Sequence, residues 1–486
     1  MTSPPADEDL DMPVPAPWAA AVAVMALLAF GVLLGSAVSP APASRAGTPV
    51  LVALTRAATK AAPPAPVSQT PAPTPETQAT TPSPASTPEP PPASTTKAPA
   101  PGKPNAQSKG LPKPSAAAQL PPIKHVFLIV LSGQGASAFS AGSPAPYLAK
   151  TLPHEGELLE NYFAVTGGEL ANAIALTSGQ GPTMQTAAGC PLYTDLTPAA
   201  AGAEGQVLGS GCVYPRTTLT LGDQLTRAGE SWKAYVEGIE TGAPGQPASC
   251  RHPPLGTTDA SNAAGAGDAY VTWRNPFVYF HSLLDSPQCA KDDIGLGQLA
   301  PDLKKTSTTP SLAYIVPGRC HDGSEVPCAP GAPAGLPAAE AFLRKVVPEI
   351  EASAAYNRGG LIAITFDQAP QSGPAADSSG CCMTAPYPNL PPPTATPTTT
   401  PAPTATSPAV SPSSAAAPPT APAGGGRVGL LLISKYVKPA SLNVTGEYNH
   451  FALLRSIENL FGLKPLGYAG APGLLAFDSS VFNAYK

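Results

Sequence analysis

Two hydrophobic patterns alternate along the second half of this chain. Continuous apolar runs, typical of strands buried on both faces, occur in HVFLIVL (125–131), SLAYIV (311–316), GLIAITFD and RVGLLLIS. Between them lie segments with helical spacing, among them LTLGDQLTRAG, PAAEAFLRKVVPEIEAS and HFALLRSIENLFGL. This alternation predicts an α/β domain with a mainly parallel central sheet and helices on both faces, in which ligands bind beyond the carboxyl ends of the strands.

The three helical segments have a recognisable end or apolar face. The first is predicted to end at Gly229, since glycine is favoured just after a helix. The second places Phe342, Val346 and Ile350 on one face. The third directs an apolar set inward, namely Leu453, Leu454, Ile457, Leu460 and Phe461.

Residues 18–38 are uncharged and long enough to cross a bilayer as a helix. A signal peptide cleaved near APASRA is the alternative, but the preceding residues 1–17 carry acidic side chains and no Lys or Arg. We predict a single-pass anchor in the cell membrane. Arg45, Arg56 and Lys60 follow it, which by the positive-inside rule favours a cytoplasmic C-terminal side.

The cysteines favour the opposite orientation. All eight lie between residues 190 and 382, and an even number in loop-like settings is typical of disulfides in an oxidising compartment. We therefore place the C-terminal domain outside the cytoplasm. Local bridges 190–212, 250–289 and 320–328 are reasonable pairings, and the neighbours 381 and 382 pair with each other or elsewhere; the sequence does not fix connectivity. The candidates are Cys190, Cys212, Cys250, Cys289, Cys320, Cys328, Cys381 and Cys382.

Proline is concentrated in two stretches that cannot form a packed core. The chain has 66 prolines, and residues 39–120 consist largely of Pro, Ala, Thr and Ser, which predicts a disordered, extended stalk. A Pro-motif ligand for a partner is the alternative. A similar stretch at about 386–423 predicts a disordered insert within the folded domain, which we place at 121–486. The net charge of −5 argues against nucleic acid as a partner.

Several motifs in one order resemble the bacterial phosphoesterase family of the alkaline-phosphatase-like superfamily, which includes phospholipase C-type enzymes and acid phosphatases. They are IKHVFLIVL, GELLENYFAVT, ELANAIALTSGQ, LTLGDQLTRAGESWKAYVEG, TPSLAYIVP, GGLIAITFDQ, GGGRVGLLLISKYVKP and YNHFALLRSIENLFGL. The resemblance implies the fold, hydrolysis of phosphoric esters and a divalent metal cofactor. In that family Glu-Asn follows the first strand, a hydroxyl nucleophile and an Asn come next, an acidic pair ends a later strand, and a His follows.

This chain departs from the family pattern at most of these places. Ser132 and Gly133 stand where Glu-Asn is expected, and Gly167 replaces a His. Glu169 stands where the nucleophilic Ser is expected, although glutamate has no hydroxyl, and Gln368 replaces the second acid. By resemblance the retained catalytic or binding set is Asp367, also a candidate metal ligand, with Glu169, Asn172, His450, Thr166 and Arg427.

Each of these residues also has a structural alternative. Asp367 ends a strand and is equally suited to capping a turn, and Glu169 suits the positive end of a helix dipole, with Asn172 one turn further on. His450 suits a cap or a core hydrogen bond as well as it suits a metal. Arg427 suits a phosphate, a sulfate or a salt bridge to Asp367. A zinc site in CHDGSEVPC has too few ligands.

Two functional hypotheses follow. The first is a membrane-anchored phosphoric ester hydrolase with an altered or weakened metal site that binds a phosphate ester. The second is a non-catalytic envelope protein that binds another anionic ligand or a partner with the residual cleft.

Overall fold

The computed structural model describes residues 120–242, 245–262, 270–382, 386–391 and 424–485. The predicted tail, anchor and nearly all of the stalk, together with residues 392–423 of the insert, lie outside this part of the chain. Among the described residues, no helix has the length and apolar character needed to cross a membrane.

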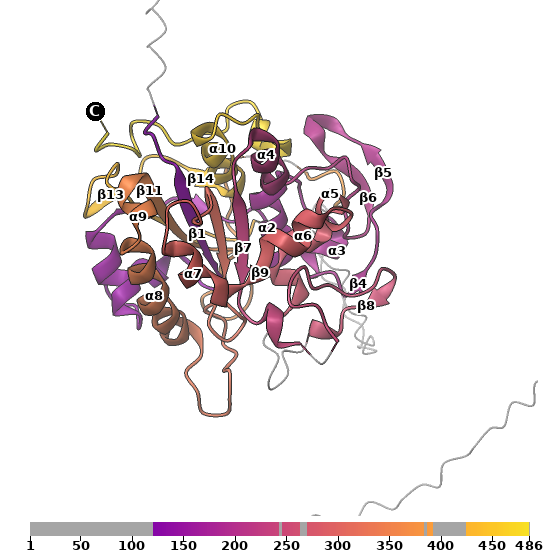
Figure 1. Cartoon of the computed structure of the whole chain (residues 1–486), viewed down its shortest axis with the longest axis horizontal. Helices are drawn as coiled ribbons and strands as arrows, with labels where there is room; N and C mark the ends of the chain where they lie inside the picture. The colour runs from indigo at the N-terminus through magenta and orange to yellow at the C-terminus, as the bar shows by residue number, and fades with distance from the viewer. Residues whose placement is uncertain (1–119, 243–244, 263–269, 383–385, 392–423, 486) are drawn as a thin grey trace, which may run out of the picture. The chain divides into compact units, whose positions relative to one another are not determined.

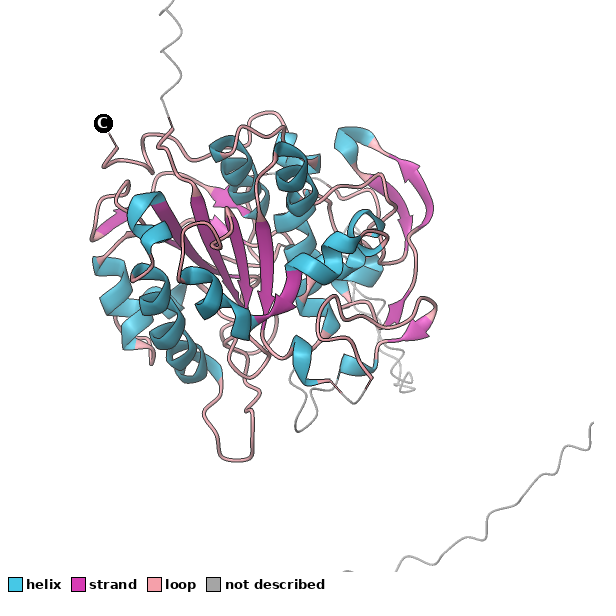
Figure 2. Cartoon of the chain, viewed as in Figure 1, coloured by secondary structure: helices cyan, strands magenta, loops and turns pink. Residues whose placement is uncertain are grey.

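An eight-stranded sheet forms the centre of the described domain (Figures 1 and 2). Its strand order is β13-β2-β12-β11-β1-β10-β7-β9. Strand β1 (His125–Leu131) runs parallel to both of its neighbours, β10 (Leu312–Val316) and β11 (Gly360–Phe366). Strands β7 (Trp232–Val236) and β9 (Asp293–Gly295) extend this parallel half. The predicted apolar runs are therefore central strands, and every residue of β1, β10 and β11 is buried.

One strand toward the other edge of the sheet runs in the opposite direction. Strand β12 (Leu430–Ile433) is antiparallel to both β11 and β2 (Glu157–Leu159), and β13 (Ser441–Asn443) is parallel to β2. The prediction of a mainly parallel sheet is thus confirmed, with one reversed strand. Two short strands, β3 (Tyr162–Phe163) and β14 (Tyr448–Asn449), pair separately beside it.

Helices cover the two faces of the sheet (Figure 2). Helices α7 (Leu299–Leu303), α8 (Gly335–Glu351) and α9 (Ala354–Gly359) lie together on one side, and α2 (Glu169–Ser178), α4 (Leu221–Ala228) and α10 (His450–Leu460) on the other (Figure 1). For the helices that connect these parallel strands, the division is the one expected of right-handed crossovers, because the chain moves one way from β1 through β7 to β9 and then back through β10 to β11.

Local sequence signals set the helix ends. In α4 the Thr220 hydroxyl accepts from the Asp223 backbone N–H (3.2 Å), and Asp223 accepts from the Thr220 N–H (2.8 Å). Helix α4 ends at Gly229, whose φ of +79° is left-handed, as predicted. The predicted apolar faces of α8 and α10 are buried, except that Leu460 and Phe461 are only partly covered.

The three local disulfides considered from the sequence are present, and of the two alternatives left open for Cys381 and Cys382 the structure has the bridge between them. The four disulfides are Cys190–Cys212, Cys250–Cys289, Cys320–Cys328 and the vicinal Cys381–Cys382. The start of the predicted insert needs correction, because residues 386–391 belong to the fold. Asn389 exchanges side-chain hydrogen bonds with the backbone of β6 (Val207–Ser210), accepting from Gly209 N–H (2.9 Å) and donating to Val207 C=O (2.7 Å).

Candidate functional site

Polar residues that follow three adjacent parallel strands meet at one edge of the sheet. Ser132 follows β1 directly, Asp367 follows β11, and Asp322 lies on the loop after β10. Backbone hydrogen bonds fix them together, from Ser132 N–H to Asp322 C=O (2.7 Å) and from Asp367 N–H to Leu131 C=O (2.9 Å). The carboxyl ends of parallel strands therefore bring two carboxylates and a hydroxyl into one buried place.

Arg274 lies in the middle of these groups. It comes from a short 3₁₀ turn, Thr272–Arg274, and only 4% of its side chain is exposed. Its Nη1 lies 3.0 Å from Oδ2 of Asp367, 3.2 Å from Oδ2 of Asp322 and 3.6 Å from Oε2 of Glu169. Its Nη2 donates to the Val130 carbonyl at the end of β1 (3.0 Å). We call Arg274, Glu169, Asp322 and Asp367 the arginine cluster.

Glu169 forms the open end of the arginine cluster. It is the first residue of α2, where the helix dipole favours a negative charge, as its structural alternative predicted. One quarter of its side chain is exposed, while Asp322 and Asp367 are buried. A solute that approached the cluster would therefore meet the carboxyl group of Glu169 first.

The charges in the cluster do not balance if every group is ionised. Burial opposes the charge on Arg274, but Asp322, Asp367 and Glu169 outweigh this effect and raise the pKa of its guanidinium. Burial and the neighbouring Glu169 raise the pKa of Asp367 well above its usual value, although Arg274 acts in the other direction. Burial likewise raises the pKa of Glu169. The fold therefore favours a charged guanidinium beside the carboxyl groups of Asp367 and Glu169, whose protonated forms are favoured by burial.

Some polar atoms of this site lack hydrogen-bond partners among the described residues. They include Oγ of Ser132, Nε of Arg274 and Oδ1 of Asp367. The Ser132 hydroxyl lies beside Glu169 and Asp367 and favours their ionised forms, but it makes no hydrogen bond of good geometry to either.

These residues do not fit the divalent metal that the family resemblance implies. The three carboxylates already surround Nη1 of Arg274, so an ion at that point would have to displace the guanidinium. His450 does not supply a free nitrogen. Its Nδ1 is paired with the Tyr162 hydroxyl (2.8 Å) and its Nε2 with the Asp367 carbonyl (2.8 Å). Burial lowers the pKa of His450 to about 4, so the ring is neutral at physiological pH.

Asn172 and Thr166 shape the loop before α2. The Asn172 amide accepts from Val165 N–H (2.8 Å) and donates to the Thr166 carbonyl (2.5 Å) and the Gly168 carbonyl (3.1 Å). Thr166 is buried, and its hydroxyl has no hydrogen-bond partner among the described residues. Asn172 therefore stabilises the loop before α2, because its side-chain amide is hydrogen-bonded to backbone groups of that loop.

The space that a His would need at position 167 is filled. A Cβ atom at Gly167 would lie 2.4 Å from Oε1 of Gln371. Gln371 is held in turn, because its Nε2 donates to the carbonyls of Ala369 (2.9 Å) and Asp377 (3.1 Å). The departure from the family pattern at 167 is therefore matched by a second residue packed against it.

Arg427 does not join the arginine cluster. Its side chain is 43% exposed and pairs with Glu160 (3.4 Å), while its backbone N–H donates to Asp377 (2.9 Å). The salt bridge from Arg427 to Asp367 considered from the sequence is replaced by that of Arg274 to Asp367.

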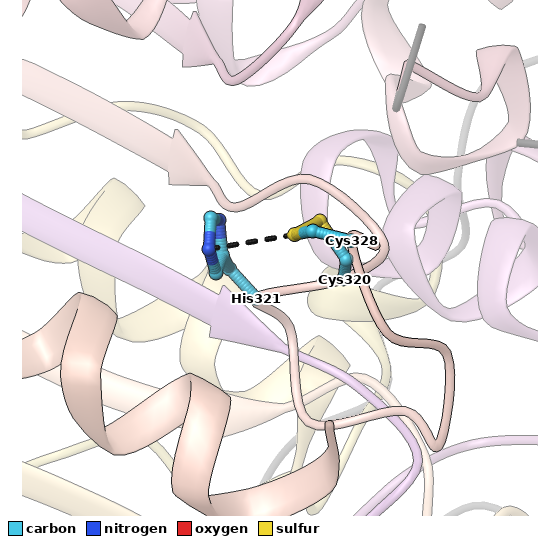
Figure 3. A group of neighbouring side chains, drawn as sticks. All are labelled: Cys320, His321 and Cys328. Carbon is cyan, nitrogen blue, oxygen red and sulfur yellow. Dashed lines mark hydrogen bonds between the residues drawn. A yellow bond between two sulfur atoms is a disulfide. The ribbon is translucent and has the colours of Figure 1, made fainter. Parts of the chain in front are cut away.

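The cysteine-rich groups are not zinc sites. Among the described residues, His, Cys and acidic side chains gather as Cys320–His321–Cys328 and as Cys250–Cys289–Asp293. In both groups the two cysteines form a disulfide, so neither sulfur is a thiolate. Figure 3 shows the first of these groups. His321 lies beside the first of these bridges and points toward it (Figure 3).

Arg274 and Asp322 were not predicted from the sequence. Asp322 had a usable signal, since it follows the predicted strand 311–316 as Asp367 follows its own strand. Arg274 had no such signal, because it lies in a stretch without strand or helix periodicity, 93 residues before Asp367.

Comparison with known proteins identifies relatives at the level of the family. The model of the family described as "Phosphoesterase family" matches residues 141–464. No curated protein matches the chain.

Solved structures resemble the chain only distantly. A protein in the alkaline phosphatase superfamily from Vibrio parahaemolyticus is 10% identical, with 74% of each chain covered and a TM-score of 0.37. The phosphonate monoester hydrolase SpPMH from Silicibacter pomeroyi is 8% identical, with 75% of this chain and 77% of that one covered and a TM-score of 0.35. A putative sulfatase from Bacteroides thetaiotaomicron is 10% identical, with 75% of each covered and a TM-score of 0.39.

Proposed function

Because the chain belongs to the phosphoesterase family, a family of phosphoric ester hydrolases, we propose that it is a non-hydrolytic member in which Arg274 takes the place of the catalytic metal. A guanidinium supplies the positive charge that holds the strand-end carboxylates together, but it cannot lower the pKa of a bound water or nucleophile as a metal ion does. The remaining role is that of an envelope protein that binds a partner.

One observation carries this proposal. A single atom, Nη1 of Arg274, lies within 3.6 Å of carboxylate oxygens from three segments of the chain, Glu169, Asp322 and Asp367. Such a point is where a hard divalent cation would find its oxygen ligands. The guanidinium of the cluster is already surrounded by three carboxyl groups, which argues against the binding of an anion by the cluster, so of the two non-catalytic readings a partner is favoured over an anionic ligand.

The second candidate is a hydrolase with a weakened site, which family membership supports. The observation in its favour is the Ser132 hydroxyl, which lies beside two carboxylates without a hydrogen-bond partner among the described residues. Such a hydroxyl is a potential nucleophile if a base activates it. Ser132 is completely buried, however, which argues against contact with a substrate in this conformation.

Turnover and metal content of the full-length protein separate the candidates. Nitrophenyl phosphate, bis-nitrophenyl phosphate and nitrophenyl sulfate are offered with Mg, Mn, Ca or Zn. We expect the wild type to hydrolyse these esters no faster than buffer alone or the Asp367→Ala variant. We also expect the purified wild type to contain less than about 0.1 divalent ion per chain. Turnover that Asp367→Ala abolishes, or about one ion per chain in the wild type, would overturn the proposal.

A gain-of-function variant tests the role of Arg274 directly. Arg274→Ala leaves three carboxylates facing one another without a positive charge, and we expect it to bind Mn²⁺ at least tenfold more tightly than the wild type in calorimetry. Arg274→Ala/Asp367→Ala is the matched control and should lose that gain. If Arg274→Ala binds no better than the wild type, Arg274 does not stand in for a cation.

We also propose that residues 18–38 anchor the domain outside the cytoplasm. The four disulfides support an oxidising compartment. Protease added to intact cells should degrade the domain, and alkaline carbonate should leave the full-length protein in the membrane pellet. Protection from external protease would contradict this orientation.

A further inference from the structure

The disulfide between Cys320 and Cys328 differs from the other three in its exposure. Cys328 is exposed, whereas Cys190, Cys212 and Cys289 are buried and the remaining cysteines are at most partly exposed. The bridge also closes the shortest loop apart from the vicinal pair, with a sequence separation of 8 against 22 and 39. A short loop restricts the unfolded chain least, so opening it sacrifices the least stabilisation.

A histidine lies directly beside the exposed sulfur. Nε2 of His321 is 3.5 Å from Sγ of Cys328, and Figure 3 shows the ring pointing at the bridge. On its other side, Nδ1 lies 3.0 Å and 3.1 Å from the two carboxylate oxygens of Glu237, at the end of β7. Glu237 is itself held by the Gly318 N–H (2.7 Å). This arrangement fixes the tautomer and aims Nε2 at the sulfur.

The surroundings leave His321 reachable and basic. Its ring packs against Phe342 of α8, yet 39% of its side chain is exposed, and it lines a cavity of about 480 Å³ with Glu237, Glu240, Lys345 and Glu349. The charged groups that act on it are Glu237, Asp322 of its own loop and Lys345 of α8. The hydrogen bond that His321 donates to Glu237 raises the pKa of His321.

We propose that Cys320–Cys328 is a redox-active disulfide that exchanges with dithiols through Cys328, with His321 as its acid–base group. An incoming thiol gives its proton to Nε2 of His321, and the resulting thiolate attacks Sγ of Cys328. The Cys320–Cys328 bond breaks, and Cys320 leaves as a thiolate. The second thiol of the reductant then attacks the mixed disulfide, and Cys328 leaves as a thiolate beside the protonated His321.

The electrons and protons balance over these two steps. The protein disulfide gains two electrons, and the dithiol is oxidised to its own disulfide. The first thiol proton resides on His321 and neutralises the charge of the Cys328 thiolate, while the proton of the second thiol passes to Cys320. In the opposite direction the Cys328 thiolate, stabilised by the imidazolium, is the nucleophile that attacks a disulfide.

Limited reduction of the oxidised full-length protein tests the proposal. Dithiothreitol is added at low concentration, new thiols are alkylated at intervals, and each cysteine peptide is quantified by mass spectrometry. We expect Cys320–Cys328 to open at least tenfold faster than Cys190–Cys212 and Cys250–Cys289. His321→Gln should slow its opening about tenfold and leave the other bridges unchanged, whereas the control His252→Gln should change none of them.

A second variant isolates Cys328 as the nucleophile. Cys320→Ser leaves Cys328 without its bridge, and its reaction with dithiobis(nitrobenzoate) releases one coloured thiolate per chain. We expect a rate at least tenfold above that of Cys320→Ser/His321→Gly, and added imidazole should restore part of the rate in the double variant. The proposal would be overturned if Cys320–Cys328 opened no faster than Cys190–Cys212. It would also be overturned if Cys328 reacted at the same rate with and without His321.

Discussion

Nη1 of Arg274 and Oδ2 of Asp367 lie 3.0 Å apart in the interior, although 93 residues separate them in the chain. Both side chains are almost completely buried. Removing one partner of a buried ion pair leaves the other without compensation, and such changes typically cost about 3–5 kcal/mol. The pair therefore matters to the stability of the fold at the strand ends whatever its role in binding.

Substitution of Arg274 and of Asp367 should have unequal effects. We expect Arg274→Met to lower the free energy of unfolding by about 3–5 kcal/mol at pH 7, because the carboxyl groups of the arginine cluster lose the one guanidinium that they share. Asp367→Asn should cost about 1 kcal/mol or less, because the raised pKa of Asp367 already favours a neutral group and the amide oxygen still accepts from Arg274. Urea denaturation measures both.

The exposed pair Arg216–Asp285 provides the control for this comparison. Its side chains are 70% and 39% exposed, so Arg216→Met should cost less than about 1 kcal/mol. An Asp367→Asn variant as unstable as Arg274→Met would show that Asp367 is fully ionised in the folded protein.

His450 should make stability depend on pH in one window. Its pKa is about 4 in the fold, against 6.5 when unfolded, so the unfolded chain binds more protons between these values. The contribution of His450 to the free energy of unfolding is complete above pH 6.5. It decreases by about 3 kcal/mol as the pH falls to 4. Relative to His450→Gln, the wild type should therefore lose that amount between pH 6.5 and 4.

The difference between the two proteins is the quantity to measure, by chemical denaturation at several pH values. Buried carboxyl groups such as Asp293, whose pKa burial raises to about 7, act in the opposite direction in both proteins and cancel in the comparison. A constant difference across the window would mean that the folded protein tolerates a charged His450.

The fold was predictable where one physical cause dominated. The buried strands were recognisable because a strand covered on both faces must be apolar along its whole length, as in β1 and β11. The sequence placed Asp367 at the sheet edge for the same reason, since it is the first charge after such a run. Pairing each cysteine with a near neighbour in the sequence also gave three of the observed disulfides.

The composition of the site was not predictable by this reasoning. Arg274 reaches the strand ends from a 3₁₀ turn that no hydrophobic period marks, so nothing in the sequence shows that the carboxylates already have a cation. Arg427 was the basic residue that the motifs offered, but its side chain pairs with Glu160 on the surface. The structural roles of His450 and Asn172 likewise depend on backbone groups that only tertiary packing brings near.

Gly167 and Gln371 should show coupled substitutions. A Cβ at position 167 lies 2.4 Å from the Gln371 side chain, so Gly167→Ala must displace a side chain that makes several hydrogen bonds. We expect a loss of about 1–3 kcal/mol. When Gln371 is first truncated to alanine, the further change Gly167→Ala should destabilise the protein much less than it does in the wild type. Thermal or urea unfolding of the single and double variants would show this difference.

The adjacent Gly168 supplies the control. A Cβ there would lie 2.6 Å from the backbone of Ala187, which cannot move aside as a side chain can. Gly168→Ala should therefore be destabilising with or without Gln371→Ala. Additive effects for Gly167→Ala and Gln371→Ala would contradict the proposed contact.

Glu458 should respond to pH with the opposite sign to His450. It lies on α10, is fully buried, and accepts from the Leu466 N–H (2.8 Å), and burial raises its pKa to about 8. Between pH 4.5 and 8 the folded chain binds more protons than the unfolded chain, so stability falls as the pH rises.

Glu458→Gln keeps the acceptor and removes the ionisation. It should equal the wild type near pH 4.5 and exceed it by about 3 kcal/mol at pH 7, whereas the exposed control Glu447→Gln should change little at either pH. A Glu458→Gln variant that is no more stable than the wild type at pH 7 would mean that the ionised carboxylate is accommodated in the fold.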